Sequence, residues 1–334
     1  MQKAAIVGCG SIAAVHSAVL NDLSGVELTA CADIRPERAE AMAKQYHLHA
    51  YPSLEAMLDA EQIDVLHICT PHYLHVPMAA EAHRRGIHVF MEKPPAISRQ
   101  QQQALFQLDD GGARIGVCFQ NRYIDAAKKL KSMLDSGETG RVLGIRGFVT
   151  WYRDAPYYTE SGWRGKLETE GGGALINQSV HTLDLMNHFL GRPDSVEAIC
   201  TNRHLKGVIE VEDTVDALID YHGIPGIFYA TTAFSVNSPV LIELACEKMT
   251  IRMEETEVTI RRPGQPVERI FYPSDCNLGK DYWGAGHYAC IEDYYRCLEE
   301  GCSFPNDLAS VRNTLDLMLS VYESATDGGK SVVL

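Results

Sequence analysis

Residues 3–13 read Lys-Ala-Ala-Ile-Val-Gly-Cys-Gly-Ser-Ile-Ala, an apolar run that ends in two closely spaced glycines and leads into a helical pattern. Gly8 can make a tight turn, Gly10 lets backbone approach a ligand without a Cβ in the way, and the small Ala13 allows close packing of a helix on a strand. A helix that begins after Gly10 points its amino terminus at an anion. The segment therefore predicts a strand–turn–helix unit that holds a pyrophosphate.

The sequence on both sides of this segment repeats the same alternation. Short apolar runs predict parallel strands at 3–7, 26–32, 64–69, 87–91 and 114–119. Segments of helical length lie between them at 11–24, 36–46, 53–59, 73–85 and 98–109. Strands that alternate with helices form a parallel, doubly wound sheet, so residues 1–122 are expected to be an α/β Rossmann domain.

The pattern changes after residue 122. A helix is expected at 126–134 and a strand at 143–151, and strand-like runs then follow one another between 195 and 272, including 216–221, 227–233 and 241–246. Two more helices are expected at 288–299 and 307–326. Consecutive strands without helices indicate a large, open, mostly antiparallel sheet, so residues 123–334 predict an α+β substrate-binding domain. Because such a sheet needs its second face covered, we expect a homodimer or homotetramer.

An acidic residue ends the second predicted strand. Asp33 follows Ala13 by 20 residues, where a carboxylate can accept hydrogen bonds from the ribose hydroxyls of a dinucleotide. It would repel a 2′-phosphate, which favours NAD over NADP, although Arg35 and Arg38 could partly offset this repulsion. The alternative is that Asp33 only caps the helix that starts at Pro36.

Two further strand ends carry polar residues, at the edge of the sheet where ligands bind. Thr70-Pro71-His72 ends one strand, and Glu92-Lys93-Pro94-Pro95 ends another. The prolines fix the backbone direction beside Lys93 and so hold its ammonium group in place. The alternative is a solvated lysine in a turn.

A second polar motif follows Glu170 and the glycines at 171–173. On an α-helix, Asn177, His181, Asp184 and His188 would form one narrow stripe on an otherwise apolar surface. Three glycines would admit a substrate or cofactor close to the backbone, so His181 is predicted to be the catalytic base and His188 to be structural. The alternative for His181 is a hydrogen-bonded histidine of the core.

These motifs together resemble the Gfo/Idh/MocA oxidoreductases over essentially the whole chain, with Trp163-Arg164 as a further match. The resemblance implies that Lys93 and His181 meet at the nicotinamide. It gives the following cofactor-binding residues: Gly8, Gly10, Ser11, Ile12, Ala13, Asp33, Ile34, Arg38, Thr70, Pro71, His72, His75, Glu92, Lys93, Asn121, Trp163 and Arg164. The expected substrate-binding residues are Lys93, Tyr152, Asn177, His181, Tyr282 and His287.

The expected catalytic residues are Lys93, His181, Asn177 and Asp184. His181 would take the proton from a sugar hydroxyl, Asp184 would fix the tautomer of its ring, and Lys93 would stabilise the alkoxide charge. Asn177 stands where many family members carry an acid, and an amide cannot take a proton. This variant is similar to the branch that contains nucleotide-sugar and glycoside 3-dehydrogenases.

Two other functions remain open at this point. The first is a redox-neutral glycosidase or lyase that oxidises a sugar transiently and restores NAD. The second is a non-catalytic regulatory protein that binds NAD, which the presence of both Lys93 and His181 disfavours.

The composition argues against several classes of binding partner. The formal net charge of -14 disfavours nucleic acid and anionic membranes, which attract basic surfaces. No apolar run approaches the roughly 20 residues of a membrane helix. The cysteines at 9, 31, 69, 118, 200 and 246 stand singly in apolar segments, and those at 290, 297 and 302 lack the spacing of a zinc site. We therefore expect a cytoplasmic enzyme without a metal.

Overall fold

The computed structural model describes residues 1–272 and 286–334, which fold into two compact units. Residues 1–119 and 287–311 form the first unit, and residues 120–286 and 312–334 form the second. The boundary that we placed after residue 122 lies close to the first crossing of the chain. Our linear division also assigned 287–311 to the second domain, whereas the structure packs this segment into the first unit.

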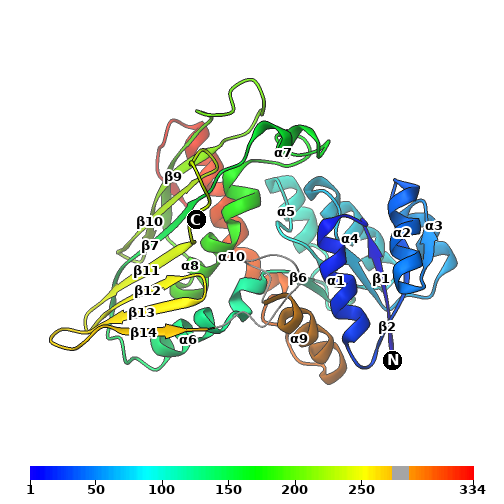
Figure 1. The fold of residues 1–334 in the computed structure, drawn as a ribbon, viewed down its shortest axis with the longest axis horizontal. Coiled ribbons are helices and arrows are strands. Elements are labelled where there is room, and N and C mark those ends of the chain that lie inside the picture. Colours follow the sequence, from blue (N-terminus) through cyan, green and yellow to red (C-terminus); the bar gives the residue numbers. More distant parts are fainter. Residues whose placement is uncertain (273–285) are drawn as a thin grey trace. The chain divides into compact units, whose positions relative to one another are not determined.

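The first unit is built on a six-stranded parallel sheet with the order β3-β2-β1-β4-β5-β6. Strands β1 and β2 of this sheet and the helices from α1 to α5 are labelled in the blue and cyan part of Figure 1. The strands are β1 (Gln2–Val7), β2 (Val26–Ala32), β3 (His49–Tyr51), β4 (Val65–Ile68), β5 (His88–Met91) and β6 (Ile115–Val117). All four residues of β4 are buried, as expected for a strand covered on both faces. The strand order reverses between β1 and β4, and ligands of such sheets bind at the carboxyl ends of the strands beside this point.

Helices connect the strands of the first unit. They are α1 (Ser11–Asp22), α2 (Pro36–Tyr46), α3 (Leu54–Ala60), α4 (His75–Arg84) and α5 (Arg99–Phe106), with a short 3₁₀ helix η1 (His72–Leu74) before α4. The later helix α9 (Gly286–Glu300) belongs to the same unit, and Tyr294 from α9 donates a hydrogen bond to the carbonyl of Val89 at 2.9 Å. Strand β3 was not among our predicted strands.

The second unit is built on a nine-stranded sheet with the order β14-β13-β12-β11-β7-β10-β9-β8-β15. Its strands are β7 (Val142–Thr150), β8 (Ser195–Thr201), β9 (Thr214–Tyr221), β10 (Ile224–Thr231), β11 (Leu241–Cys246), β12 (Thr250–Glu254), β13 (Glu257–Arg261), β14 (Glu268–Phe271) and β15 (Val332–Val333). Strands β7 and β10 pair in parallel, and the other neighbouring pairs are antiparallel. The predicted fold class is therefore confirmed.

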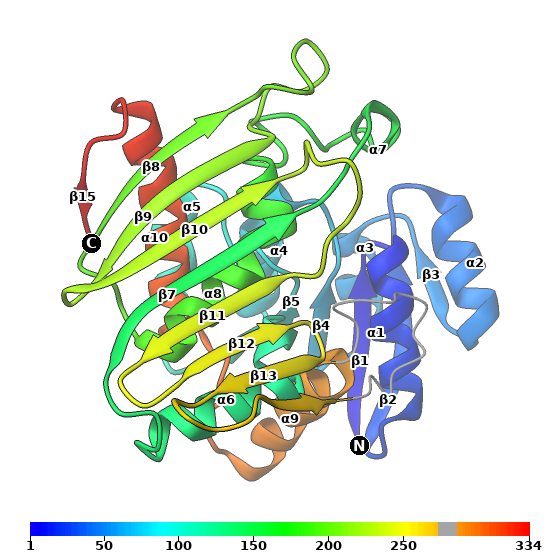
Figure 2. The same cartoon turned by 60° about the vertical axis from the view of Figure 1, so that its left-hand side comes forward.

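Helices of the second unit cover one face of this sheet. The unit contains η2 (Gln120–Tyr123), α6 (Asp125–Asp135), α7 (Ala155–Thr159), η3 (Ala174–Ser179), α8 (Val180–Leu190) and most of α10 (Leu308–Thr326). Figure 2 shows α8 and α10 behind the strands. Helix α8 can approach β7 closely because a Cβ on Gly147 would lie 2.7 Å from the sulfur of Met186.

The opposite face of the nine-stranded sheet carries exposed side chains of mixed character. Along β9 the residues alternate between buried and exposed, and Leu218 of β9 and Ile227 of β10 are 58% and 47% exposed. No described helix of the second unit lies over this face (Figure 2). In the described part of the chain, no helix combines the length and the apolar character that crossing a membrane requires.

Candidate active site

The glycine turn after β1 has the geometry that the sequence predicts. Gly8 has a φ of +88°, and a Cβ there would lie 2.7 Å from the carbonyl oxygen of Cys69, so no other residue fits. At Gly10 a Cβ would meet nothing within 4 Å, so the space in front of α1 is open. Ala13 is fully buried, where it allows helix and sheet to approach each other. The turn thus leaves room for a ligand at the amino terminus of α1.

Asp33 is fixed next to this turn. Its Oδ2 accepts a hydrogen bond from the N–H of Cys9 at 2.7 Å, and its Oδ1 accepts one from the N–H of Arg35 at 2.8 Å. The N-cap residue of α2 is Arg35, and no side chain makes a capping hydrogen bond at this helix start. Asp33 therefore does not cap α2. The carboxylate still has lone pairs for the hydroxyls of a ribose. Its position supports the cofactor interpretation over the capping alternative.

Apolar and cationic side chains follow Asp33. Ile34 is 86% exposed, and Arg38 lies exposed on the first turns of α2. An exposed aliphatic side chain beside Asp33 suits contact with an adenine ring. Both residues therefore remain compatible with the predicted contact to the dinucleotide.

His75 joins the ends of β4 and β5. Its Nε2 lies 2.9 Å from the carbonyl oxygen of Thr70, and its Nδ1 lies 2.8 Å from that of Pro94. Burial lowers the pKa of this imidazole. Because both ring nitrogens face backbone carbonyls, His75 holds the two loops together, and a direct contact with the cofactor is not the role that this geometry supports. The neighbouring His72 is also buried.

Glu92 lies at the centre of a buried polar network in the first unit. Its Oε1 lies 3.0 Å from Nε2 of His16 on α1 and 3.9 Å from Nε2 of His287 on α9. Nδ1 of His16 lies 2.9 Å from Nδ1 of His67, whose Nε2 lies 3.0 Å from the hydroxyl of Tyr295. The network thus connects the strand end that carries Lys93 to α1 and α9.

The protonation states in this network are set by burial and by neighbouring charges. Burial opposes the charged form of His16, but the nearby Cys69 and Glu92 overcome it and raise the pKa of His16 to about 10. The same histidine lowers the pKa of Glu92, although burial opposes this. A charged His16 donates to both neighbours, so His67 accepts at Nδ1 and stays neutral, in agreement with its strongly lowered pKa.

Cys118 approaches the same two residues. One ligand atom each from His16, Glu92 and Cys118 lies within 4.8 Å of the others. An ion pair between His16 and Glu92 already explains the arrangement, so we assign it to holding the Glu92–Lys93 loop. His287, which we expected to bind substrate, has its Nε2 3.9 Å from the Glu92 carboxylate, and its contact with a substrate stays a prediction.

The glycines before η3 are required by packing within the protein. A Cβ on Gly172 would lie 2.0 Å from the hydroxyl of Tyr322, and one on Gly173 would lie 2.0 Å from the carbonyl oxygen of Glu212. Our interpretation that these glycines make room for a ligand is therefore not needed to explain them. Glu212 itself is buried and accepts hydrogen bonds from the N–H groups of Gly173 and Leu175, all at 3.0 Å. It thereby anchors the start of η3.

Residues 174–179 form a π-helix, not the start of a continuous α-helix as we expected. A π-turn contains more residues than an α-turn, so Asn177 is rotated away from the stripe that the α-helical spacing predicts. Its Nδ2 donates a hydrogen bond to Oε1 of Glu170 at 2.5 Å. His181, Asp184 and His188 all lie on α8, where the expected spacing applies.

His181 is 6% exposed on the first turn of α8. Its Nε2 lies 3.4 Å from the amide nitrogen of Gln120. An amide nitrogen can only donate, so this contact favours the ring tautomer that carries its proton on Nδ1. In that tautomer Nε2 is the basic atom.

Asp184 binds a different partner from the one we expected. Its carboxylate accepts bidentate hydrogen bonds from Arg122 at 2.8 and 2.6 Å, and its Oδ1 also accepts one from Thr314 at 2.8 Å. These bonds tie α8 to η2 and α10, so Asp184 acts as an anchor in this structure and not through the ring of His181.

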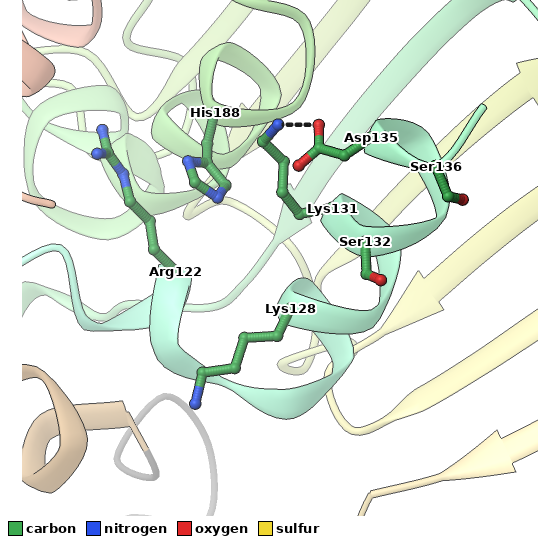
Figure 3. Close-up of a pocket in the computed structure, with 7 residues that line it drawn as sticks. All are labelled: Arg122, Lys128, Lys131, Ser132, Asp135, Ser136 and His188. Carbon is green, nitrogen blue, oxygen red and sulfur yellow. Dashed lines mark hydrogen bonds and ion pairs between the residues drawn. The ribbon is translucent and has the colours of Figure 1, made fainter.

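An open pocket of the second unit is shown in Figure 3. It is lined by Arg122, Lys128, Lys131, Ser132, Asp135, Ser136 and His188. Arg122 pairs with Asp184, and Lys131 pairs with Asp135. Burial, together with Arg122 and Lys131, lowers the pKa of His188 to about 4, so this ring is neutral. The pocket contains none of the predicted substrate-binding residues, which supports the structural interpretation of His188.

Two of the remaining predicted residues, Trp163 and Arg164, are in contact with each other in the second unit. The Arg164 guanidinium stacks 4.5 Å from the ring centre of Tyr157 and 5.1 Å from that of Trp163. Tyr152 is 42% exposed. The predicted residue Tyr282 lies outside the described residues.

Asn121 is fully buried in η2. Neither end of its side-chain amide has a hydrogen-bond partner among the described residues. Leaving both ends of a buried amide without partners costs about 1–3 kcal/mol per group, so a bound ligand that supplies partners is the natural explanation. This buried amide is compatible with the predicted contact between Asn121 and a dinucleotide.

Several residues of the site were not among our predictions. His16 lies between buried apolar residues of α1, and a histidine on the buried face of that helix is the signal that could have identified it. Glu170 directly precedes the glycine run in the sequence. The partner of Asp184, Arg122, is 62 residues away and carries no local signal.

The first unit therefore has the fold and the fixed carboxylate of a dinucleotide-binding domain, and the second places a buried histidine on a helix. This combination defines a nicotinamide-dependent oxidoreductase. Comparison with family models agrees: one for an oxidoreductase family with an NAD-binding Rossmann fold matches residues 2–116, and one for the GFO/IDH/MocA C-terminal domain matches residues 127–252.

Proteins that are similar in sequence or in structure are also dehydrogenases. D-glucoside 3-dehydrogenase of Escherichia coli (strain K12) is 30% identical over 260 residues, which cover 70% of this chain and 71% of the relative. Levoglucosan dehydrogenase of Pseudarthrobacter phenanthrenivorans is 28% identical, over 88% of this chain and 86% of the relative. The crystal structure of the WlbA dehydrogenase of Bordetella pertussis with NADH and UDP-GlcNAcA has a TM-score of 0.86 and 28% identity, covering 99% and 98% of the two chains.

This chain belongs to the Gfo/Idh/MocA family of oxidoreductases. The predictions of the family, of an NAD-binding first domain and of an oxidoreductase are thereby confirmed.

Proposed function

We propose that the protein transfers a hydride between NAD and a secondary hydroxyl carbon of a sugar, a glycoside or a nucleotide sugar. The observation that carries the proposal is that the chain has both Lys93 and His181, two groups that can handle a proton and a negative charge, on the scaffold of an NAD-binding oxidoreductase. A regulatory protein that only binds NAD needs neither a proton acceptor nor a group that stabilises an alkoxide.

The substrate class is supported by the relatives. D-glucoside 3-dehydrogenase and levoglucosan dehydrogenase are named for carbohydrate substrates, and the WlbA structure contains a nucleotide sugar. All of them act on or bind molecules in which a ring carbon carries a hydroxyl group. We infer the same chemical class for this chain.

In the proposed reaction, bound NAD supplies the hydride acceptor. Nε2 of His181 takes the proton from the reacting hydroxyl, because the contact with Gln120 favours the tautomer in which this atom is basic. The Lys93 ammonium stabilises negative charge on the oxygen as the proton leaves. The pair of His16 and Glu92 holds the loop that carries Lys93. In the reverse direction, the same two groups protonate the oxygen of a ketone.

A panel of hexosides, nucleotide sugars and cyclitols tests the proposal. With NAD and the correct substrate, the protein should produce NADH and a keto sugar in equal amounts. Release of the aglycone without net NADH would identify the redox-neutral glycosidase or lyase. Tight binding of NAD without turnover of any polyol would instead identify a regulatory protein.

We also infer that the protein assembles through the uncovered face of the nine-stranded sheet, because Leu218 and Ile227 expose apolar area there. A homodimer or homotetramer would cover this face. The nine free cysteines of the described residues support a reducing, cytoplasmic compartment.

A further inference from the structure

Two cysteine thiols meet at the carboxyl-terminal end of α9 in the first unit. The sequence places cysteines at 290, 297 and 302 without the spacing of a zinc site, and the structure brings the last two together. Sγ of Cys302 lies 3.0 Å from Sγ of Cys297. Cys290 is fully buried and accepts a hydrogen bond from the side-chain amide of Asn306 instead. The sequence motif is therefore a pair of thiols and a separate core cysteine.

The end of α9 explains why the two sulfurs are neighbours. Gly301 follows the helix with a φ of +72°, the left-handed conformation that ends many helices. This reversal folds the next residue, Cys302, back onto the last turns of α9, where Cys297 lies. Arg114, just before β6, fixes the turn, since its Nη1 donates to the carbonyl oxygens of both cysteines at 2.8 Å. The backbone on both sides thus holds the two sulfurs together.

The two thiols differ in their access to solvent. Cys302 is half-exposed, and Cys297 is buried. The Arg296 guanidinium lies beside both, with Nη1 3.7 Å from Sγ of Cys302 and Nη2 3.5 Å from Sγ of Cys297. Positive charge next to a sulfur favours the thiolate, which is the form that attacks a disulfide. Asp293 and Glu300 bind the same guanidinium and hold it in place, although they partly neutralise its charge.

We propose that Cys297 and Cys302 form a reversible thiol-oxidation site, which takes a low-molecular-weight disulfide of the glutathione type as its oxidant. The half-exposed Cys302 reacts first, and the buried Cys297 resolves the product. The sulfurs of a disulfide are about 2.05 Å apart, so the two atoms have to approach each other by about 1 Å. The site does not depend on the proposed hydride transfer. In a reducing compartment a disulfide of this kind is transient.

The exchange balances in two steps. The Cys302 thiolate attacks one sulfur of the small disulfide, which forms a mixed disulfide and releases one small thiolate. The Cys297 thiol then loses its proton and attacks Sγ of Cys302, which closes the Cys297–Cys302 bond and releases the second small thiolate. The two cysteines lose two electrons and two protons in total. The small disulfide takes up both electrons, and the two released thiolates take up the protons.

The first step makes the second one easier. Burial is the largest cause that raises the pKa of the Cys297 thiol to about 12, and Cys302 and Asp293 raise it as well, while Arg296 lowers it. In the mixed disulfide Cys302 has neither a thiol proton nor a negative charge, so its contribution disappears and that of Arg296 remains. Cys297 therefore resists oxidation on its own and becomes a better nucleophile once Cys302 has reacted.

Peptide mapping of the whole protein tests the proposal without a substrate. Trypsin cuts after Arg296 and Arg312, so both cysteines lie in the single peptide 297–312. The folded protein is treated with glutathione disulfide and quenched with acid, and its remaining thiols are alkylated in denaturant. The peptide should take up no alkyl group and should be lighter than the reduced peptide by two hydrogen atoms. Treatment with dithiothreitol before alkylation should restore both alkyl groups.

Two serine variants separate the two steps. Cys297→Ser removes the resolving thiol, so one glutathione should stay on Cys302. Cys302→Ser removes the attacking thiol, so Cys297 should stay reduced. Cys200 is the internal control, because it is half-exposed as well, but burial and the carboxylates of Glu212 and Asp216 raise the pKa of its thiol. Its thiol should take up an alkyl group in every sample.

Three outcomes would overturn the proposal. A wild-type peptide that still takes up two alkyl groups would show that the site does not react, whether or not the variants fold. Glutathione that stays on Cys302 of the wild type while Cys297 is alkylated would show that the two sulfurs do not close. Modification of Cys297 in Cys302→Ser at the wild-type rate would contradict the order of the two steps. All three can be read whether or not the protein oxidises a carbohydrate, so a failure of the proposed function is distinguishable.

Discussion

The raised pKa of Glu170 predicts that this residue makes the protein less stable as the pH rises. The carboxyl is fully buried, and burial is the largest cause that raises its pKa from 4.5 to about 7. Between these two values the folded protein keeps a proton that the unfolded chain has released. Stability therefore falls as the pH increases from about 4.5 to about 7, and it changes no further above that range.

The magnitude follows from the size of the pKa difference. At about 1.4 kcal/mol per pH unit, Glu170 should remove about 3 kcal/mol of unfolding free energy by neutral pH. Glu170→Gln is neutral at every pH and can keep the hydrogen bonds with Asn177 and Gly165. We therefore expect the variant to lie within about 1 kcal/mol of the wild type at about pH 5 and to be more stable by about 3 kcal/mol at about pH 8.

Urea unfolding of both proteins at these two pH values is the assay. The pKa of the nearby Glu212 is also raised by burial, but its contribution is present in both proteins and largely cancels in the difference. The exposed control, Glu168→Gln, should show no pH-dependent difference from the wild type. A stability difference between Glu170→Gln and the wild type that is the same at both pH values would refute the reasoning.

Three further predictions concern the cofactor, the assembly and Asn177. The protein should bind NAD more tightly than NADP, because the carboxylate of Asp33 repels a 2′-phosphate, and comparative titration checks this; equal or tighter binding of NADP would contradict it. Leu218→Lys on the uncovered sheet face should shift the protein to a smaller species in light scattering, and a wild-type monomer at micromolar concentration would remove the basis of this prediction. Asn177→Asp should stay folded and active with an altered pH–rate profile, because two adjacent carboxyls at 170 and 177 would share a proton and raise one pKa; an unchanged profile would show that they do not interact.

The fold was predictable where local patterns are strong. Continuous apolar runs identified the central strands of the first unit, and the spacing from Ala13 to Asp33 identified the dinucleotide site. Strand β3 was missed because it has three residues, two of them exposed, so no apolar run marks it. The segment 287–311 was assigned to the wrong unit because its tertiary contacts, such as that of Tyr294 with Val89, have no local signature.

The site was less predictable, because its geometry depends on contacts across long sequence separations. The α-helical spacing placed Asn177 in line with His181, but the π-turn at 174–179 directs it to Glu170. Nothing in the composition of that segment distinguishes a π-turn from an α-turn. Similarly, Asp184 has the right spacing to assist His181, and only the folded structure shows that it pairs with Arg122.

The central claim is that His181 takes the proton in an NAD-dependent oxidation, and kcat of His181→Ala on the true substrate tests it most directly. His188→Ala is the matched control, since His188 lies on the same helix and is assigned a structural role. Loss of the base should lower kcat by on the order of 10² to 10⁴, while NAD affinity stays within a few-fold and His188→Ala remains close to the wild type. A His181→Ala enzyme with near-normal kcat would contradict the account, because the proton would then leave by another route.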